Sequence, residues 1–454
     1  MSNPLVMKSG GGLIAVGLAA LMLWAGPAAA QDPERMDQVV RRAVDQGEFT
    51  GSVLVVRDGE VLLDRGYGLA NREWNIANDG ETKFRLASVS KQFTAVAVML
   101  LVQQGQVDLD APVKTYLTDA PATWDAVTVR HLLNHTSGVP NFTGFDDYQA
   151  LKTLPTTVDG LIARFRDRPL DFQPGERWSY SNSAYVLATA IIERVSGRTY
   201  ADFVVENLFR PLDMADSGYD RHETILPRRA SGYSPDTDGV VNADYVDMSV
   251  PQGAGALYST THDLRQWEDG LFGGRLLNAA SMAELTRPGL DDYALGLFVK
   301  PSGDGQVISH TGGIEGFNTY MGRDTGRAIT VVALSNLNSP SVGKLGGDLM
   351  TLAQGGDVTL PEERRAVAIA PETLAEYEGD YALAPTFVLT VSVADGQLTV
   401  QATGQGRNIL GAEGADAFFT QGIDARIVFT RDAAGQVTGL VLHQNGRQMP
   451  APKR

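Results

Sequence analysis

The chain of 454 residues contains no cysteine, which excludes disulfide bonds, thiol nucleophiles and metal sites with cysteine ligands. Basic residues are the minority among the charged ones, with 38 Lys and Arg against 54 Asp and Glu, and no long basic run occurs. A chain with a net charge of -16 is poorly suited to bind nucleic acid or an anionic membrane. We therefore expect no nucleic-acid partner.

Histidines are also few, and among the six only His131 and His135 are four residues apart. Two histidines at that spacing on a helix can bind zinc, but a zinc protease has Glu directly after the first, where this chain has Leu132. The sequence also contains no Gly-x-Ser-x-Gly elbow, no phosphate-binding glycine loop and no dinucleotide-binding fingerprint. We therefore expect neither a metal nor a cofactor.

Long hydrophobic runs are confined to the N-terminus. Lys8 precedes an apolar core at 13–24, Gly26-Pro27 breaks the run, and Ala28-Ala29-Ala30 follows. This order is typical of a secretory signal peptide over 1–30, cleaved after Ala30. The mature protein is then expected in the periplasm or outside the cell, without a stable membrane anchor. A retained anchor is the alternative, although the apolar core is short for a membrane span.

The pattern of hydrophobic residues divides the rest of the chain into two parts. Strand patterns near 52–67 and 306–334 enclose a helix-rich region, which predicts an α+β domain over 31–353 with one antiparallel sheet flanked by helices. The composition changes over 354–371, which we interpret as a linker. Short strands separated by turn residues over 372–454 predict a small all-β domain, either a barrel or a sandwich.

The most informative stretch runs from Phe84 to Ala95 and is predicted to begin a helix, with Ser88 at its start and Lys91 one turn later. Residues three apart share a helix face, so the hydroxyl and the amine are expected side by side. The apolar residues that follow, up to Gly105, place the Lys in a poorly solvated environment, where its pKa falls and its amine can act as a base. These are the conditions for an activated serine nucleophile.

Two further motifs lie downstream. Tyr180-Ser181-Asn182 precedes an apolar helix; a Tyr phenol near a Lys ammonium can have a lowered pKa and move a proton, and an Asn amide can bind a substrate carbonyl. His310-Thr311-Gly312-Gly313 ends a predicted strand, where glycines let a substrate backbone approach and the Gly313 N–H can point at a carbonyl oxygen. Alone, each motif is more often structural. A second Ser-x-x-Lys at 341–344 is followed by glycines, and we expect no apolar helix to support it, so we interpret it as accidental.

Taken in order, the three motifs resemble those of the serine β-lactamase and penicillin-binding protein superfamily. The branch that they resemble contains class C β-lactamases, D-alanyl-D-alanine carboxypeptidases and related esterases, and the run from Leu132 to Gly138 is typical of it as well. The resemblance covers about residues 35 to 350. The tail around Leu374 to Tyr381 resembles the lipocalin-like domain that some members carry.

The resemblance implies a role for each motif residue. Ser88 is the implied nucleophile, which forms an acyl-enzyme, and Asn182 is implied to hold the substrate amide. Lys91 is implied to take or relay the serine proton, and Tyr180 to protonate the leaving group and activate the deacylating water. Which of these two residues is the acylation base stays open.

The third motif carries a departure from the family pattern. The backbone N–H groups of Ser88 and Gly313 are the implied oxyanion hole, and His310 and Thr311 are implied to bind the far end of the substrate. Class C β-lactamases usually have Lys where this chain has His310. A His is mostly neutral at pH 7, so recognition of a substrate carboxylate is expected to be weaker, which argues against a dedicated β-lactamase.

The sequence therefore predicts an exported serine hydrolase that acts through an acyl-enzyme on a small-molecule or peptide substrate. A D-amino-acid peptide is the first candidate and a small ester the second. A β-lactamase is one alternative, and a catalytically idle binding or scaffold protein of the same fold is another. For the C-terminal domain we expect a structural, lid or oligomerisation role, which allows for a homo-oligomer.

Overall fold

The computed structural model describes Met1 and residues 32–236, 239–394, 396–420, 425–444 and 447–454. Apart from Met1, the predicted signal peptide over 1–30 lies outside the described residues. Within the described ranges, no helix has both the length and the apolar character that a membrane span requires.

In the described ranges, most α-helices lie before residue 290, and more than half of the strands lie after it. The helices of the described ranges are α1 Pro33–Asp45, α2 Ser90–Gln103, α3 Val129–Leu133, α4 Tyr148–Leu151, α5 Val158–Phe165, α6 Asn182–Ser196, α7 Tyr200–Val204, α8 Thr261–Phe272, α9 Ala279–Leu285, α10 Val342–Ala353 and α11 Pro371–Leu374. The strands are β1 Gly51–Arg57, β2 Glu60–Tyr67, β3 Leu69–Asn71, β4 Ile76–Ala77, β5 Phe84–Arg85, β6 Gly218–Tyr219, β7 Tyr233–Asp236, β8 Gly239–Asn242, β9 Leu257–Ser259, β10 Phe298–Ser302, β11 Gly305–Ile314, β12 Phe317–Asp324, β13 Ile329–Ser335, β14 Gly379–Ala384, β15 Phe387–Ala394, β16 Gln397–Ala402, β17 Arg407–Ala412, β18 Ala417–Thr420, β19 Ala425–Arg431, β20 Val437–Gln444 and β21 Arg447–Pro452.

A six-stranded antiparallel sheet forms the centre of the first part of the chain, in the order β10-β11-β12-β13-β1-β2. Strands from both ends of this part meet in it, because β1 pairs with β13 along its whole length. Apolar residues occupy both faces of these two strands: Leu54 and Val332 point to one side, and Val55 and Val331 to the other. The alternation of a strand thus supplies two separate cores, and the predicted α+β fold is confirmed.

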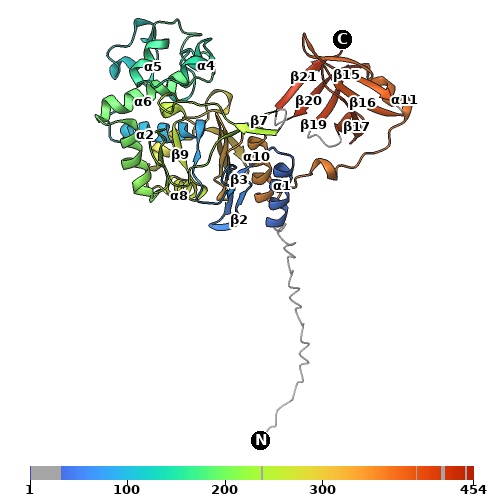
Figure 1. Ribbon diagram of the computed structural model, residues 1–454, viewed down its shortest axis with the longest axis horizontal. Helices are drawn as coiled ribbons and strands as arrows, with labels where there is room; N and C mark the ends of the chain where they lie inside the picture. The colour runs from blue at the N-terminus through green and yellow to red at the C-terminus, as the bar shows by residue number, and fades with distance from the viewer. Residues whose placement is uncertain (2–31, 237–238, 395, 421–424, 445–446) are drawn as a thin grey trace. The chain divides into compact units, whose positions relative to one another are not determined.

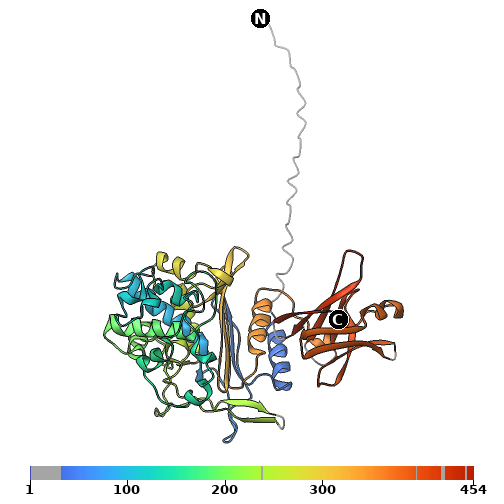
Figure 2. The same cartoon turned by 90° about the horizontal axis from the view of Figure 1, so that it is seen from above.

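One face of the sheet carries the large helical region, and α1 and α10 lie side by side on the other, as Figure 2 shows with the sheet seen edge-on. On the helical face, α2 is buried from Ser90 to Leu101 and packs against α6. A helix that is hydrophobic all round belongs inside a domain rather than on its surface. Lys91 is therefore carried into the interior by the element on which it lies.

The second part of the chain is an eight-stranded antiparallel sheet whose order follows the sequence, from β14 to β21 (Figure 1). A bridge between Tyr381 and Lys453 brings its first and last strands together, so the sheet closes almost completely into a barrel. The rings of Tyr377, Phe418 and Phe429 pack against one another in its core. The predicted all-β domain is confirmed, and its interior is filled largely by its own side chains.

We propose that the hydrolase domain over 31–353 and the barrel domain over 372–454 are separate folding domains, joined by the linker over 354–371. In support, Leu360 packs with the core on the α1 side of the first sheet, whereas Ile369 packs with the core of the barrel.

The structure also differs from the sequence-based expectations. The frequent Pro, Gly and Asp residues over 213–260 predict a loop-rich stretch, but it also contains β6 and β9, which form a small sheet with β5, and the hairpin of β7 and β8. The expected strands began at Gln306, but β10 precedes them as the edge of the main sheet. The expectation that no apolar helix follows Ser341 is wrong, because α10 begins at Val342.

Candidate active site

Ser88 lies where three parts of the chain meet. It is the middle residue of a short 3-10 turn, η1 Ala87–Val89, directly before α2. Its Oγ is 3.2 Å from Lys91 Nζ and 2.8 Å from Tyr180 Oη. The spacing along the helix thus places the amine beside the hydroxyl, and a loop 92 residues further on brings the phenol to its other side.

The turn that presents Ser88 is held by two neighbouring strands. Leu86 donates its N–H to Leu257 O of β9, and its carbonyl accepts from Thr319 Oγ1 of β12. Ala87 has a φ of 49°, in the left-handed region that residues with a side chain seldom adopt. These contacts hold a strained backbone directly before the nucleophile, as is common at functional sites.

Lys91 is fully buried, and its amine contacts neutral groups only. Besides Ser88, Nζ donates to Asn182 Oδ1 and to the backbone carbonyl of Ala254, each at 2.8 Å. Removal from water disfavours the charged form, so burial lowers the pKa of Lys91 well below its usual value. In the described part of the chain, the hydrogen-bond partners of its amine include no carboxylate, so none of them restores the charge.

Tyr180 stands on a loop that His135 holds from both sides. The His135 carbonyl accepts from Ser179 N at 2.9 Å, and its Nδ1 accepts from Ser181 N at 3.2 Å. Its ring centroid is 4.4 Å from that of Tyr180. His135 is itself buried, with a φ of 61°. It fixes the two backbone positions that flank the phenol.

The pKa of Tyr180 departs from the sequence-based expectation. A neighbouring ammonium was expected to lower it, but burial of the phenol raises the pKa of Tyr180 above its usual value. The reason is that the phenol itself is removed from water, and its hydrogen bond to Ser88 opposes this rise only in part. The phenol is consequently a proton donor at neutral pH.

Asn182 is the first residue of α6, and Ser181 caps that helix with its side chain. Asn182 Nδ2 lies 3.3 Å from Thr143 Oγ1, while its Oδ1 accepts from Lys91. The Asn182 amide therefore links Lys91 to Thr143.

The third motif lies along the free part of β11. The pairing of β10 with β11 ends at Phe298 opposite Ser309, so residues 310–314 extend beyond their neighbour on that side. This part of the strand packs against η1, which brings Gly313 next to Ser88. An unpaired strand edge offers backbone N–H and C=O groups to an extended substrate.

Both ring nitrogens of His310 are already engaged. Nδ1 lies 2.6 Å from the carbonyl oxygen of Thr311, so it carries the proton, and Nε2 accepts from Tyr293 Oη at 3.0 Å. Burial lowers the pKa of His310 to about 3. The side chain of Thr311 is exposed to solvent instead. His310 is thus a neutral wall residue rather than a free cation.

Two cavities meet at Ser88 and Gly313. The larger one, of about 410 Å³, is called the Tyr180 chamber here, and it is lined by Ser88, Tyr180, Phe298, His310, Thr311, Gly312, Gly313, Asn318, Thr319, Ser339, Pro340, Val342 and Gly343. The smaller one, of about 80 Å³, is called the Asn182 chamber and is lined by Ala87, Ser88, Phe142, Thr143, Tyr148, Asn182, Val250, Pro251, Ala254, Gly255, Gly313 and Ile314. A substrate carbonyl at Ser88 therefore has space on both sides of the bond to be broken.

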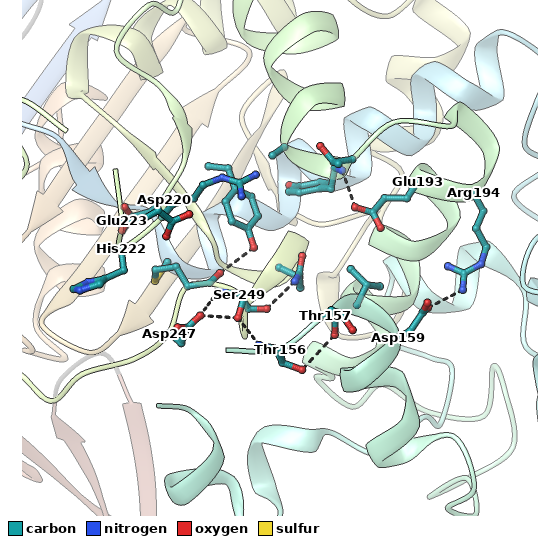
Figure 3. A pocket seen from close by; sticks show the side chains of 18 residues that line it. Thr156, Thr157, Asp159, Glu193, Arg194, Asp220, His222, Glu223, Asp247 and Ser249 are labelled. Carbon is teal, nitrogen blue, oxygen red and sulfur yellow. Dashed lines mark hydrogen bonds and ion pairs between the residues drawn. The ribbon is translucent and has the colours of Figure 1, made fainter. Parts of the chain in front are cut away.

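A separate cavity of about 430 Å³, shown in Figure 3, is lined by residues of α5, α6 and α7 and by residues between Tyr219 and Gln252. None of the motif residues lines it. Its polar side chains are largely paired with one another: Arg194 contacts Asp159, and Ser249 donates to Asp247. We assign no chemistry to this cavity.

Sequence reasoning missed three parts of the site. The carbonyl of Ala254 is a backbone group without a sequence signal. His135 was considered only within its motif and as half of a zinc pair, and His131 instead accepts from Thr128 N at the start of α3. The N-terminus of α10 walls the Tyr180 chamber, but Lys344 on that helix pairs with Asp348.

Comparison with known proteins identifies the family. The family model described as Beta-lactamase matches residues 36–354, most of the chain. The chain belongs to the beta-lactamase family. Residues 363–451 of this beta-lactamase-family protein match a domain of unknown function, DUF3471. It is accordingly a serine hydrolase related to β-lactamases and penicillin-binding proteins.

Individual relatives extend the similarity over the whole chain. Penicillin-binding protein 4* of Bacillus subtilis is 29% identical over 439 residues, 90% of this chain and 95% of its own. The octameric penicillin-binding protein homologue from Pyrococcus abyssi covers 92% of this chain and 100% of its own, with 25% identity and a TM-score of 0.67. The D-amino acid amidase from Ochrobactrum anthropi SV3 covers 67% of this chain and 92% of its own, with 27% identity and a TM-score of 0.61.

Proposed function

We propose that this protein is an exported serine hydrolase that cleaves an amide, peptide or ester of a D-amino acid through an acyl-enzyme on Ser88. The observation that carries the proposal is the position of Ser88 Oγ between a buried amine and a phenol, at 3.2 and 2.8 Å. The likeness to D-amino acid amidase supports an amide of a D-residue as the first substrate class to test. A small ester is the second.

We assign the acylation base to Lys91. A neutral amine carries two N–H bonds, which match the two acceptors Asn182 Oδ1 and Ala254 O, and its lone pair is left for the hydroxyl proton of Ser88. The lowered pKa of Lys91 keeps this form available at neutral pH. The raised pKa of Tyr180 makes the phenolate a poor candidate for the same role.

The reaction then follows from these positions. Ser88 Oγ bonds to the substrate carbonyl carbon while its proton passes to Lys91, 3.2 Å away, and we assign the binding of the oxyanion to the N–H groups of Ser88 and Gly313, which line the same cavity. The bond between the carbonyl carbon and the leaving atom breaks as Tyr180 donates its phenolic proton to that atom. Lys91 then passes the proton that it took from Ser88 to Tyr180. A water molecule then attacks the acyl-enzyme ester and gives a proton to Lys91 and Tyr180. The bond between the acyl carbon and Ser88 Oγ breaks, the acid is released, and Ser88 Oγ takes a proton back from the same two residues.

Labelling and turnover test this proposal together. The mature protein is incubated with a fluorophosphonate probe, a penicillin, a chromogenic ester and a D-alanyl peptide. Wild type is expected to label at Ser88 and to turn over at least one acyl substrate, whereas Ser88→Ala does neither. Ser341→Ala, in the second Ser-x-x-Lys, is the matched control and should behave as wild type.

Each other result has a definite reading. Turnover that survives in Ser88→Ala removes the nucleophile assignment. Rapid release of hydrolysed penicillin favours a β-lactamase. Absence of both labelling and turnover leaves an idle binding protein. Localisation of the full-length chain by fractionation tests export, since the proposal requires the processed protein outside the cytoplasm.

A further inference from the structure

The charge of the cleft bears on the substrate, because a charged group enters a desolvated site only where an opposite charge awaits it. The walls of the Tyr180 chamber contain hydroxyls, an amide, glycines and rings, and those of the Asn182 chamber are mainly apolar. No Asp, Glu, Lys or Arg is among the residues that line either chamber within the described part of the chain.

Two charged side chains that follow or neighbour lining residues in the sequence are paired within the protein. Lys152 lies 2.8 Å from Glu315, next to Ile314 of the Asn182 chamber. Lys344, next to Gly343 of the Tyr180 chamber, lies 2.6 Å from Asp348. Each of these charges is compensated within the protein, so a substrate ion gains little from it.

The orientation of the substrate follows from the proton donor. Tyr180 lines only the larger of the two chambers, and the leaving atom must lie within reach of its hydroxyl. The leaving group therefore occupies the Tyr180 chamber and the acyl group the Asn182 chamber. A water-sized group occupies about 30 Å³. The Asn182 chamber, with about 80 Å³, therefore suits an acyl group with a short side chain.

Resting on the function proposed above, we propose that the substrate is uncharged on both sides of the bond that is cleaved. The acyl side is a small residue without a free ammonium group, and the leaving side is an alcohol, or an amine without a free carboxylate. His310 cannot replace the missing cation, because its Nδ1 is bound to the Thr311 carbonyl and its Nε2 to Tyr293.

The test is a two-by-two comparison on one scissile bond. The four compounds are D-alanyl-D-alanine, its N-acetyl derivative, its C-terminal amide, and the peptide blocked at both ends, with cleavage at the central bond followed by mass spectrometry. We expect the doubly blocked peptide to have the highest kcat/KM, and each free charge to lower it by about tenfold or more. Equal or better cleavage of a peptide with a free end overturns the proposal.

Salt and pH separate the cleft from other causes. The net charge of -16 repels carboxylates at long range, but about 0.5 M NaCl screens that field. A preference that disappears in salt belongs to the whole surface and contradicts the proposal. Lowering the pH from about 7.5 to about 5.5 should not improve cleavage of the free acid, because an engaged His310 stays neutral there.

A variant that adds a cation to the Tyr180 chamber tests whether the missing charge sets the preference for an uncharged leaving group. Thr311 is exposed in the Tyr180 chamber, so Thr311→Lys places a cation there without disturbing the core, and Thr311→Met is the uncharged control of similar length. The ratio of acid to amide cleavage should rise by about tenfold or more in the first variant only. An unchanged ratio in Thr311→Lys contradicts the placement of the leaving group.

Esters decide the case in which no peptide is cleaved. Butyryl p-nitrophenyl ester and succinyl p-nitrophenyl ester differ by a carboxylate on the acyl side, and the butyryl compound should acylate Ser88 faster. Equal rates overturn the proposal. Failure of the proposed function would look different, since neither ester would react in a Ser88-dependent way and the fluorophosphonate would not label.

Discussion

At the scale of single residues, the site depends on His135 as much as on the side chains that do the chemistry. This residue contributes no group to Ser88, yet its carbonyl and its Nδ1 hold the backbone on either side of Tyr180. Its left-handed φ of 61° turns both groups toward the same loop. Tyr180 Oη can stay 2.8 Å from Ser88 Oγ only while that loop is held in place.

Replacing His135 should therefore lower turnover more than it weakens substrate binding. In His135→Ala the N–H of Ser181 loses its acceptor, and a buried bond of this kind is worth about 1–3 kcal/mol. We expect kcat to fall at least about tenfold, with a smaller change in KM. Steady-state kinetics on a chromogenic ester, together with a thermal melt, measures both.

The neighbouring His131 supplies the control. Its Nδ1 also accepts a backbone N–H, but from Thr128, which caps the start of α3, and not from the loop that carries Tyr180. His131→Ala should lose stability and keep its kcat. The same drop in kcat for both variants would mean that His135 acts only through the stability of the fold.

The sequence could predict the side chains of the site because each has a local signal. Lys91 follows Ser88 by three residues, and the apolar residues after it announce burial. The pKa of Tyr180 could not be predicted in the same way, since its direction depends on how completely the folded chain buries the phenol. The carbonyl of Ala254 could not be predicted either, because every residue carries one.

At the scale of secondary structure, the close contact between β11 and η1 brings together the two residues of the proposed oxyanion hole, Ser88 and Gly313. Gly312 lies at this contact, where a Cβ atom would collide with Leu86 O and Thr319 Oγ1. Gly313, one residue later, is less crowded: a Cβ there meets only Asn318 Nδ2, at 3.2 Å, and this side-chain end need shift by only a few tenths of an ångström. The two adjacent glycines thus have different reasons to be glycine.

This difference predicts opposite behaviour for the two alanine variants. Gly312→Ala should push β11 away from the nucleophile turn, with a loss of at least about 2 kcal/mol in stability and about a hundredfold in kcat. Gly313→Ala should melt within a few degrees of wild type. Urea unfolding and ester hydrolysis measure the two effects, and a stable, fully active Gly312→Ala protein would contradict the geometry.

Elements that depend on tertiary contacts were the ones that sequence patterns missed. Glycines at 343, 346 and 347 lower the intrinsic helix propensity of α10, yet the helix forms. A Cβ on Gly346 would collide with the ring of Tyr320, so this glycine serves close packing. Likewise β9 has only three residues, and its strand conformation is fixed by its partners β5 and β6.

At the scale of the whole molecule, one buried acid links stability to pH. Glu268 of α8 is buried on the helical side of the sheet, and burial raises its pKa from 4.5 to about 8, against the opposing effect of Arg323 and with a smaller contribution from Asp269. The folded state therefore binds a proton that the unfolded state releases between these values. The stability that this proton contributes is present below pH 4.5 and is lost as the pH rises through about 8.

Glu268→Gln should remove this dependence, because a neutral amide fills the same space. Between about pH 6 and about pH 9 the free energy of unfolding of wild type is expected to fall by a few kcal/mol relative to the variant. Lys91 and His135, whose pKa values are lowered by burial, give the opposite trend in both proteins and cancel in the difference. Parallel urea titrations measure it, and a constant difference across this range would refute the assignment.

The barrel has its own weak point at the seam where it closes. The two residues directly after β21 help to close the ring: Lys453 bridges to Tyr381, and Arg454 donates its N–H to Asp380 O at 2.8 Å. Deletion of a few residues here would remove these bonds and leave two unpaired strand edges, at which other copies of the protein can pair and aggregate. A fusion partner joined directly after Arg454 should therefore weaken the closure of the barrel.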